Sequence, residues 1–172
     1  PEQGHGDMIQ FARYAPLLAA RGARVIVQTY VELTALMRTL EGVERVVALG
    51  ESEPPADIVT PLASLPLVCG TQLDSVPAQV PYLRAPPERL AVWQQRLGPR
   101  SRRRIGLAWW GSQHIPKRSL TIETLLPVLS RPAIEVHALQ KEIPSAQRDW
   151  LGPELLDAAT GAVRSFQTAD VM

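Results

Sequence analysis

Apolar and polar positions along the chain follow two periods. In residues 8–21 apolar side chains recur as on one face of a helix, and Gly22 follows as a stop signal. Pro16 lies inside this pattern, so we expect a kink or a late helix start there. Residues 23–29 form a β-branched, apolar run, which predicts a strand buried on both faces of a sheet.

The same alternation of strand and helix continues along the rest of the chain. Further strands are predicted at 44–49, 57–60, 105–109 and 134–139, with a short one around 155–156. Helices are predicted at 32–40, 86–97 and 121–129, with short ones within 61–81 and near 146–151. Short strands that alternate with helices indicate an α/β fold with parallel sheets.

The alternation occurs in two series, which predict two Rossmann-like halves. We place the first at 1–99, a basic linker at 100–104 and the second at 105–172. The linker contains four arginines and a serine. A phosphate or nucleic-acid patch is the functional interpretation, but no aromatic residues are interleaved, so a solvated linker is favoured.

Composition excludes some classes of function. The formal net charge is +1, which gives no reason to expect nucleic acid or an anionic membrane surface as partner. A single cysteine excludes an internal disulfide and a multi-cysteine metal site, and the three histidines lack ligand spacing, so no metal is expected. No run reaches the ~18 apolar residues of a membrane span. We expect a cytoplasmic enzyme or binding domain.

A first candidate ligand loop precedes the first helix. Gly4 and Gly6 permit a close backbone approach to a ligand, and Asp7 would stand at the helix N-terminus, where a carboxylate could act as a general base. The alternative is that Asp7 only caps the helix, and spacing alone favours the cap. His5 is either a second polar group of this site or a passive loop residue.

A second candidate loop follows the strand at 105–109. Gly111 allows a close approach, and Lys117 and Arg118 bring positive charge near the next helix, which suits a diphosphate. A polar surface turn with Ser119 or Thr121 as the helix cap is the alternative. Gln140 and Lys141 follow the strand at 134–139 and form a third candidate.

Several stretches together resemble one family. The first is Glu2-Gln3-Gly4-His5-Gly6-Asp7-Met8-Ile9-Gln10-Phe11-Ala12-Arg13-Tyr14. Others, in the family's order, are Pro16–Gly22, Leu73–Pro77, Val80–Leu83, Ile105–Trp109, Arg118–Leu120 and Leu139–Lys141. They resemble the glycosyltransferase domain of bacterial tetratricopeptide-repeat proteins, which is similar to ADP-heptose:lipopolysaccharide heptosyltransferases and more distantly to O-linked N-acetylglucosamine transferases.

This resemblance implies a GT-B fold, with the active site in the cleft between an acceptor-side and a nucleotide-sugar-side domain. It implies an inverting, metal-independent transfer from a nucleotide sugar, without another cofactor, to a glycan, lipid-linked sugar or protein acceptor. Asp7 is then the base, within an acceptor loop of Gly4, His5 and Gly6. The nucleotide-sugar candidates are Gly111, Lys117, Arg118, Gln140 and Lys141.

The resemblance also implies that the chain is part of a longer protein. The strand that precedes Glu2 in the family and the Asp-Thr-Ser and His-Leu-Ala-Gly motif that follows the second half are not in the sequence. We therefore expect this fragment alone to be inactive and tetratricopeptide repeats to occur in the same natural chain. A catalytically silent binding or scaffold domain is the rival interpretation. A nucleotide-sugar epimerase is disfavoured, because no Gly-x-Gly-x-x-Gly follows a strand.

Overall fold

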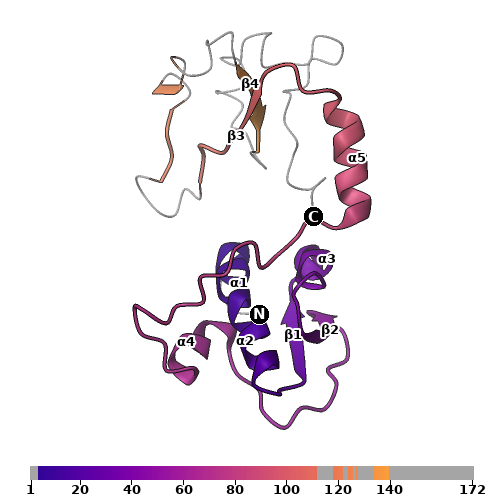
Figure 1. The fold of residues 1–172 in the computed structure, drawn as a ribbon, viewed down its shortest axis with the longest axis vertical. Coiled ribbons are helices and arrows are strands. Elements are labelled where there is room, and N and C mark those ends of the chain that lie inside the picture. Colours follow the sequence, from indigo (N-terminus) through magenta and orange to yellow (C-terminus); the bar gives the residue numbers. More distant parts are fainter. Residues whose placement is uncertain (1–3, 112–117, 122–123, 126, 128–133, 140–172) are drawn as a thin grey trace. The chain divides into compact units, whose positions relative to one another are not determined.

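Each half of the chain contains one pair of parallel strands (Figure 1). The computed structural model describes residues 4–111, 118–121, 124, 125, 127 and 134–139. The chain divides into two units, Pro1–Val92 and Trp93–Val171. The mixed α/β class and the parallel pairing are confirmed. The GT-B arrangement and the domain boundary at 100–104 stay predictions.

The first unit begins with a helix that is interrupted just before Pro16, which lies in the first turn of the second segment. Helix α1 (His5–Phe11) runs into a single 3₁₀ turn, η1 (Ala12–Tyr14), and then into α2 (Ala15–Ala20). Proline has no N–H, and its ring crowds the carbonyl four residues earlier, so the α-helical hydrogen bonding cannot continue through this point. The expected kink is confirmed, although the helix begins at His5 rather than at residue 8.

Two parallel strands follow. β1 (Val25–Thr29) pairs with β2 (Val43–Ala48), with Ile26 opposite Arg45 and Thr29 opposite Ala48. The connection between them contains η2 (Val31–Leu33) and α3 (Thr34–Met37), so the predicted helix at 32–40 is shorter than expected. Parallel strands need such a crossover, because a tight turn can only reverse the chain direction.

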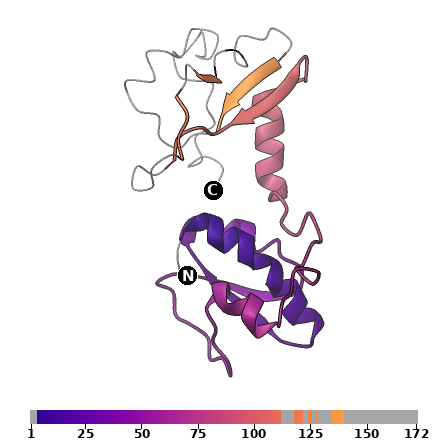
Figure 2. The ribbon, with the colours of Figure 1, turned by 90° about the vertical axis from the view of Figure 1, so that its left-hand side faces the viewer.

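The core of the first unit lies between the helices and one face of the strand pair. Helices α1 and α2 lie beside β1 in Figure 1 and from the second angle of Figure 2. The buried residues of this core are Met8, Ala12, Ala15, Val25, Val27, Leu33, Met37, Leu40 and Val46. Along β1, every second residue is buried and the others are half-buried. The expectation that both faces of this strand are buried is therefore wrong for Ile26 and Gln28.

Residues 57–60 do not form the predicted third strand. Ile58 and Val59 are 84% and 85% exposed. Prolines at 54, 55 and 61 flank the segment and have no backbone donor for a sheet, which is a physical reason why a β-branched pair here stays unpaired. The short helix predicted within 61–81 is confirmed as η3 (Leu62–Ser64) followed by α4 (Leu65–Val68).

Helix α5 (Pro87–Leu97) crosses the boundary between the units and leads to β3 (Arg103–Leu107). β3 pairs in parallel with β4 (Ile134–Ala138), and Figure 2 shows the two strands side by side. β3 begins two residues earlier than predicted, so Arg103, which is exposed, and Arg104 belong to the strand. Residues 124, 125 and 127 are helical, as expected for 121–129. The elements predicted at 146–151 and 155–156 lie outside the described residues.

None of the helices in the described part of the chain has the length and apolar character needed to cross a bilayer.

The glycine before β2, Gly42, lies close to Ala19 of α2, and this contact leads to our first prediction. Gly42 has φ 74°, and a Cβ added there would lie 2.5 Å from the Cβ of Ala19 in α2. We expect Gly42→Ala to lower the free energy of unfolding by about 2–3 kcal/mol, because it combines a left-handed backbone with a steric clash. Urea denaturation followed by far-UV circular dichroism measures this change.

Gly22→Ala is the matched control. Gly22 has φ 90°, but an added Cβ would meet nothing within 4 Å. The free energy of unfolding of this variant should fall only by the cost of placing alanine in a left-handed backbone conformation, on the order of 1 kcal/mol. Equal losses in the two variants would contradict a role for the contact with Ala19.

Candidate functional site

The first predicted loop forms the N-terminus of α1. The Gly4 N–H donates a hydrogen bond to Oδ2 of Asp7 at 3.1 Å, and the Asp7 N–H donates to the Gly4 carbonyl at 3.1 Å. This reciprocal pair satisfies backbone groups that a helix start leaves open. Asp7 therefore has a capping role, from the third helical position rather than from the N-cap itself. The negative charge is also favourable at this end of the helix dipole.

His5 connects this loop to the end of β1. Its ring contacts the Tyr30 ring edge to face, with centroids 4.9 Å apart and an interplanar angle of 83°. Its Nε2 lies 3.8 Å from Oε2 of Glu32. Tyr30 directly follows β1, so the loop stands at the carboxyl end of that strand. This is the edge at which parallel α/β sheets bind ligands.

A buried hydroxyl lies at the same strand end. Thr29 is the last residue of β1 and is 0% exposed, and within the described part of the chain its Oγ1 has no hydrogen-bond partner. A buried hydroxyl without a hydrogen-bond partner destabilises the folded state, because it has lost its hydrogen bonds to water. The sequence pattern did not indicate Thr29, because threonine is common in β-branched runs.

The Thr29 hydroxyl generates a second prediction. We expect Thr29→Val to leave the free energy of unfolding unchanged or raise it by up to about 1 kcal/mol, because an isosteric methyl removes a buried polar atom that has no partner. Thermal and urea denaturation of the variant measure this change.

Thr39→Val is the matched control in the same unit. The Thr39 hydroxyl donates to the Leu36 carbonyl at 2.7 Å and accepts from the Arg84 N–H at 3.0 Å. The substitution should therefore lower the free energy of unfolding by about 1–2 kcal/mol. If Thr29→Val destabilises as much as Thr39→Val, the Thr29 hydroxyl has a partner in solution.

The second predicted loop is closed by hydrogen bonds between its two ends. The Leu120 N–H donates to the Trp109 carbonyl at 2.9 Å, and the Gly111 N–H donates to Oγ of Ser119 at 3.1 Å. A Cβ added to Gly111 would lie 3.5 Å from the Cβ of Arg118. The structure thus brings Gly111 and Arg118 together. The Gly111 N–H and the Ser119 hydroxyl are hydrogen-bonded to each other.

This loop leaves the second sheet at the carboxyl end of its strands. β3 ends at Leu107 and β4 at Ala138, and the Leu139 N–H donates to the Leu107 carbonyl at 2.8 Å. The chain after β3 and the chain after β4 therefore emerge at one edge, as ligand binding in an α/β sheet requires. Lys117, Gln140 and Lys141 lie outside the described residues, and their roles stay predictions.

A polar cluster at the start of the second sheet was not indicated by the sequence. Oε2 of Glu135 accepts a hydrogen bond from Nε of Arg104 at 3.0 Å, and Oε1 lies 3.0 Å from Nε2 of His137. The arginine belongs to a basic run, which is typical of solvated chain. The register of the two strands would have indicated this cluster, because it places Arg104 directly opposite Glu135.

Arg104 also holds the end of α5. Its Nη2 donates to the carbonyls of Leu97, Gly98 and Pro99, at 2.7, 3.1 and 3.1 Å. Leu97 is the last residue of α5, where a carbonyl has no intrahelical partner, and Gly98 and Pro99 directly follow the helix. A cationic side chain is also favourable at the negative end of the helix dipole. The cluster therefore joins the last turn of α5 to both strands of the second sheet.

The ionisation of Glu135 generates a third prediction. Burial acts to raise the pKa of Glu135, but the Arg104 hydrogen bond and the charges of His137 and Arg104 outweigh it, so the pKa lies below its usual range. A lowered pKa stabilises the folded state above the unfolded pKa, and that contribution is lost as the pH falls through the folded pKa. We expect Glu135→Gln to lower the free energy of unfolding at neutral pH. As the pH falls below the ordinary pKa of glutamate, the free energy of unfolding of the variant should decrease less steeply than that of the unmodified protein.

Tryptophan fluorescence measures this effect in the second unit, because residues 93, 109, 110 and 150 are the four tryptophans of the chain. Glu41→Gln removes the same charge from an exposed side chain and serves as the control. Identical acid profiles for the two variants would contradict the stabilising role of Glu135.

No protein-family model, curated protein or solved structure matches the chain. The resemblance to heptosyltransferase-like domains therefore rests on the sequence motifs.

Proposed function

We propose that the chain is part of a cytoplasmic glycosyltransferase of the GT-B kind, which transfers a sugar from a nucleotide sugar to an acceptor hydroxyl with inversion and without a metal. One observation carries this proposal. In each unit, a glycine-containing loop predicted to bind substrate lies at the carboxyl end of a parallel strand. The motifs that resemble the heptosyltransferase family supply the reaction class.

The chemistry assigns one role to each unit. The Asp7 carboxylate accepts the proton of the acceptor hydroxyl, whose oxygen attacks the anomeric carbon as the bond to the nucleotide diphosphate breaks. Positive charge from Lys117 and Arg118 stabilises the diphosphate that leaves. Gly4, His5 and Gly6 line the acceptor side, and Gly111, Gln140 and Lys141 the donor side. The natural acceptor is a glycan, a lipid-linked sugar or a protein.

A catalytically silent binding or scaffold domain is a second candidate, and two observations favour it. Oδ2 of Asp7 is engaged by the Gly4 N–H, so one oxygen of the proposed base has a structural partner. The Gly111 N–H is engaged by Ser119 and is therefore not directed at a diphosphate. Both hydrogen bonds would have to yield to substrate in an active enzyme.

The two candidates differ in the effect of Asp7→Asn, which is our fourth prediction. In the protein as the cell makes it, this substitution should abolish sugar transfer, by about 100-fold or more, because an amide cannot act as a general base. It should leave the stabilisation by a nucleotide sugar unchanged. A thermal-shift panel of ADP-heptose, UDP-N-acetylglucosamine and GDP-linked sugars, with free nucleotides as references, measures binding through the melting temperature.

Asparagine retains an acceptor oxygen for the Gly4 N–H, so the variant should keep the α1 cap. Glu32→Gln is the matched control, because Glu32 is a carboxylate next to His5 at the same strand end and has no proposed catalytic role. Transfer that persists at the normal rate in Asp7→Asn would show that Asp7 is not the base. A well-folded protein that responds to no nucleotide sugar would favour the silent domain.

A further inference from the structure

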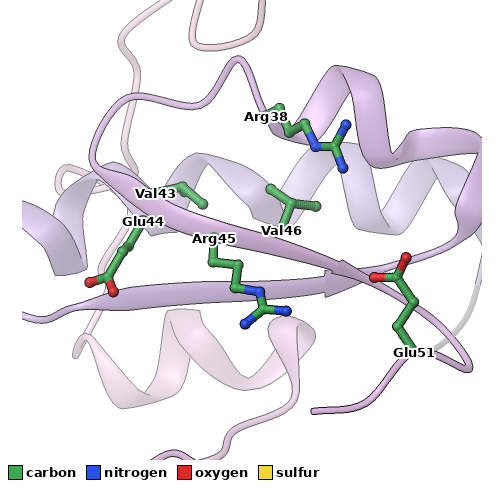
Figure 3. Close-up of a pocket in the computed structure, with 6 residues that line it drawn as sticks. All are labelled: Arg38, Val43, Glu44, Arg45, Val46 and Glu51. Atoms are coloured by element: carbon green, nitrogen blue, oxygen red, sulfur yellow. The ribbon is translucent and has the colours of Figure 1, made fainter. Parts of the chain in front are cut away.

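An open concavity of about 410 Å³ lies along β2 and belongs to neither predicted loop. Figure 3 shows β2 crossing the view, with Arg38 above the strand and Arg45 below it. The lining residues come from the end of α3, from β2 and from the turn after it: Arg38, Val43, Glu44, Arg45, Val46 and Glu51. The concavity therefore combines two cations, two carboxylates and two apolar side chains.

Both carboxylates of this concavity already have partners. The Arg24 guanidinium donates to the two oxygens of Glu44, at 2.8 and 2.6 Å. These hydrogen bonds also hold the pKa of Glu44 below its usual range. Oε2 of Glu51 accepts a hydrogen bond from the Ala48 N–H at 3.0 Å. The charge of Glu44 is therefore paired with Arg24, whereas Glu51 keeps its negative charge, because a backbone N–H is neutral.

The two cations are not compensated. Arg38 and Arg45 are both exposed, and within the part of the chain that the structure describes, neither guanidinium has a hydrogen bond or an ion pair. Their two positive charges outnumber the one negative charge of Glu51, so the concavity favours an anionic ligand.

The backbone of β2 adds a second feature. Among the described residues, β2 pairs with β1 on one side and with no strand on the other. The Leu49 N–H donates to the Thr29 carbonyl at 2.8 Å, so the backbone groups of Leu49 face β1. Backbone groups alternate in direction along a strand, which turns those of Ala48 and Val46 to the free edge. The Glu51 carboxylate on the Ala48 N–H confirms this direction for Ala48.

We propose that this concavity binds an acidic peptide segment, which adds in an extended conformation along the free edge of β2 and places its carboxylates on Arg38 and Arg45. An extended peptide supplies both donors and acceptors to a strand edge, whereas a simple anion supplies acceptors alone. The Glu51 side chain already makes one such carboxylate contact to the edge from within the chain. Val43 and Val46 line the same concavity and offer apolar contact to a peptide side chain next to the acidic pair.

Charged residues on an edge strand also prevent edge-to-edge aggregation, which is the simpler account of Arg45. That account does not extend to Arg38, which lies after α3 and outside the strand.

The test uses the 172-residue chain and a fluorescein-labelled, N-acetylated peptide of sequence Thr-Val-Glu-Glu-Val-Thr, whose neighbouring glutamates point to opposite faces of an extended chain. Fluorescence anisotropy at low salt measures its dissociation constant. Arg38→Gln and Arg45→Gln should each weaken binding about two- to fivefold, as expected for an exposed ion pair. Arg24→Gln should also weaken binding, because it releases the Glu44 carboxylate into the concavity. Arg21→Gln removes the same charge from an exposed position outside the concavity and should have no effect.

The amide resonance of Val46 distinguishes addition to the strand edge from simple attraction of charge. The peptide should shift this resonance and slow its hydrogen exchange, whereas inorganic phosphate at the same charge concentration should leave its exchange unchanged. The proposal is overturned if a peptide with glutamine in place of glutamate binds equally well, or if Arg21→Gln weakens binding as much as Arg45→Gln. It is also overturned if Val46 responds equally to phosphate, or if no binding is detected.

Discussion

The parallel pairing of the strands is the constraint on which the described structure depends. Parallel strands cannot be joined by a tight turn, so each pair requires a crossover that carries the chain back along the sheet. In the first unit this crossover contains α3, and α1 and α2 pack against the same strands. The helix that begins at His5 therefore starts beside the carboxyl end of β1, where Tyr30 and Glu32 meet it. The position of the first loop follows from this connectivity.

Hydrogen-bond satisfaction explains most of the polar side chains near these strand ends. Asp7, Ser119 and Glu51 each accept a hydrogen bond from a nearby backbone N–H. These N–H groups lie at helix starts, loop closures or strand edges, where the regular ladders supply no partner. Thr29 is the exception, since its buried hydroxyl has no partner among the described residues. Side chains that could act in catalysis or ligand binding at the candidate site therefore also make hydrogen bonds that stabilise the fold.

The sequence predicted the parts of the fold that depend on local pattern. Apolar runs located β1, β2 and β4, the prolines before Glu88 and the Gly98-Pro99 pair bounded α5, and Pro16 predicted the interruption of the first helix. The segment 57–60 has the composition of a strand but lies exposed, because pairing depends on a neighbour that composition does not reveal. Likewise, Arg104 could not be distinguished from its basic neighbours, since only the register with Glu135 places it in the polar cluster.

The sequence predicted where the two candidate loops lie along the chain, but their roles stay predictions. The second loop follows β3, as predicted, whereas the first lies beside the carboxyl end of β1, a neighbour that the sequence did not indicate. The same residue types serve capping and catalysis, so the sequence left open whether Asp7 is a base, and its hydrogen bond to Gly4 leaves room for both roles. Gly111 and Arg118 prove to be neighbours because Leu120 returns to Trp109, a closure that no spacing pattern indicates.

The grip of Arg104 on the end of α5 has a mechanical consequence. One guanidinium nitrogen holds three successive carbonyls, while the other side of the group is braced against Glu135. One side chain therefore links the last turn of α5 and the residues after it to both strands of the second sheet. We expect a displacement of this turn to reach β3 and β4 through Arg104 as well as through the backbone between Pro99 and Arg103.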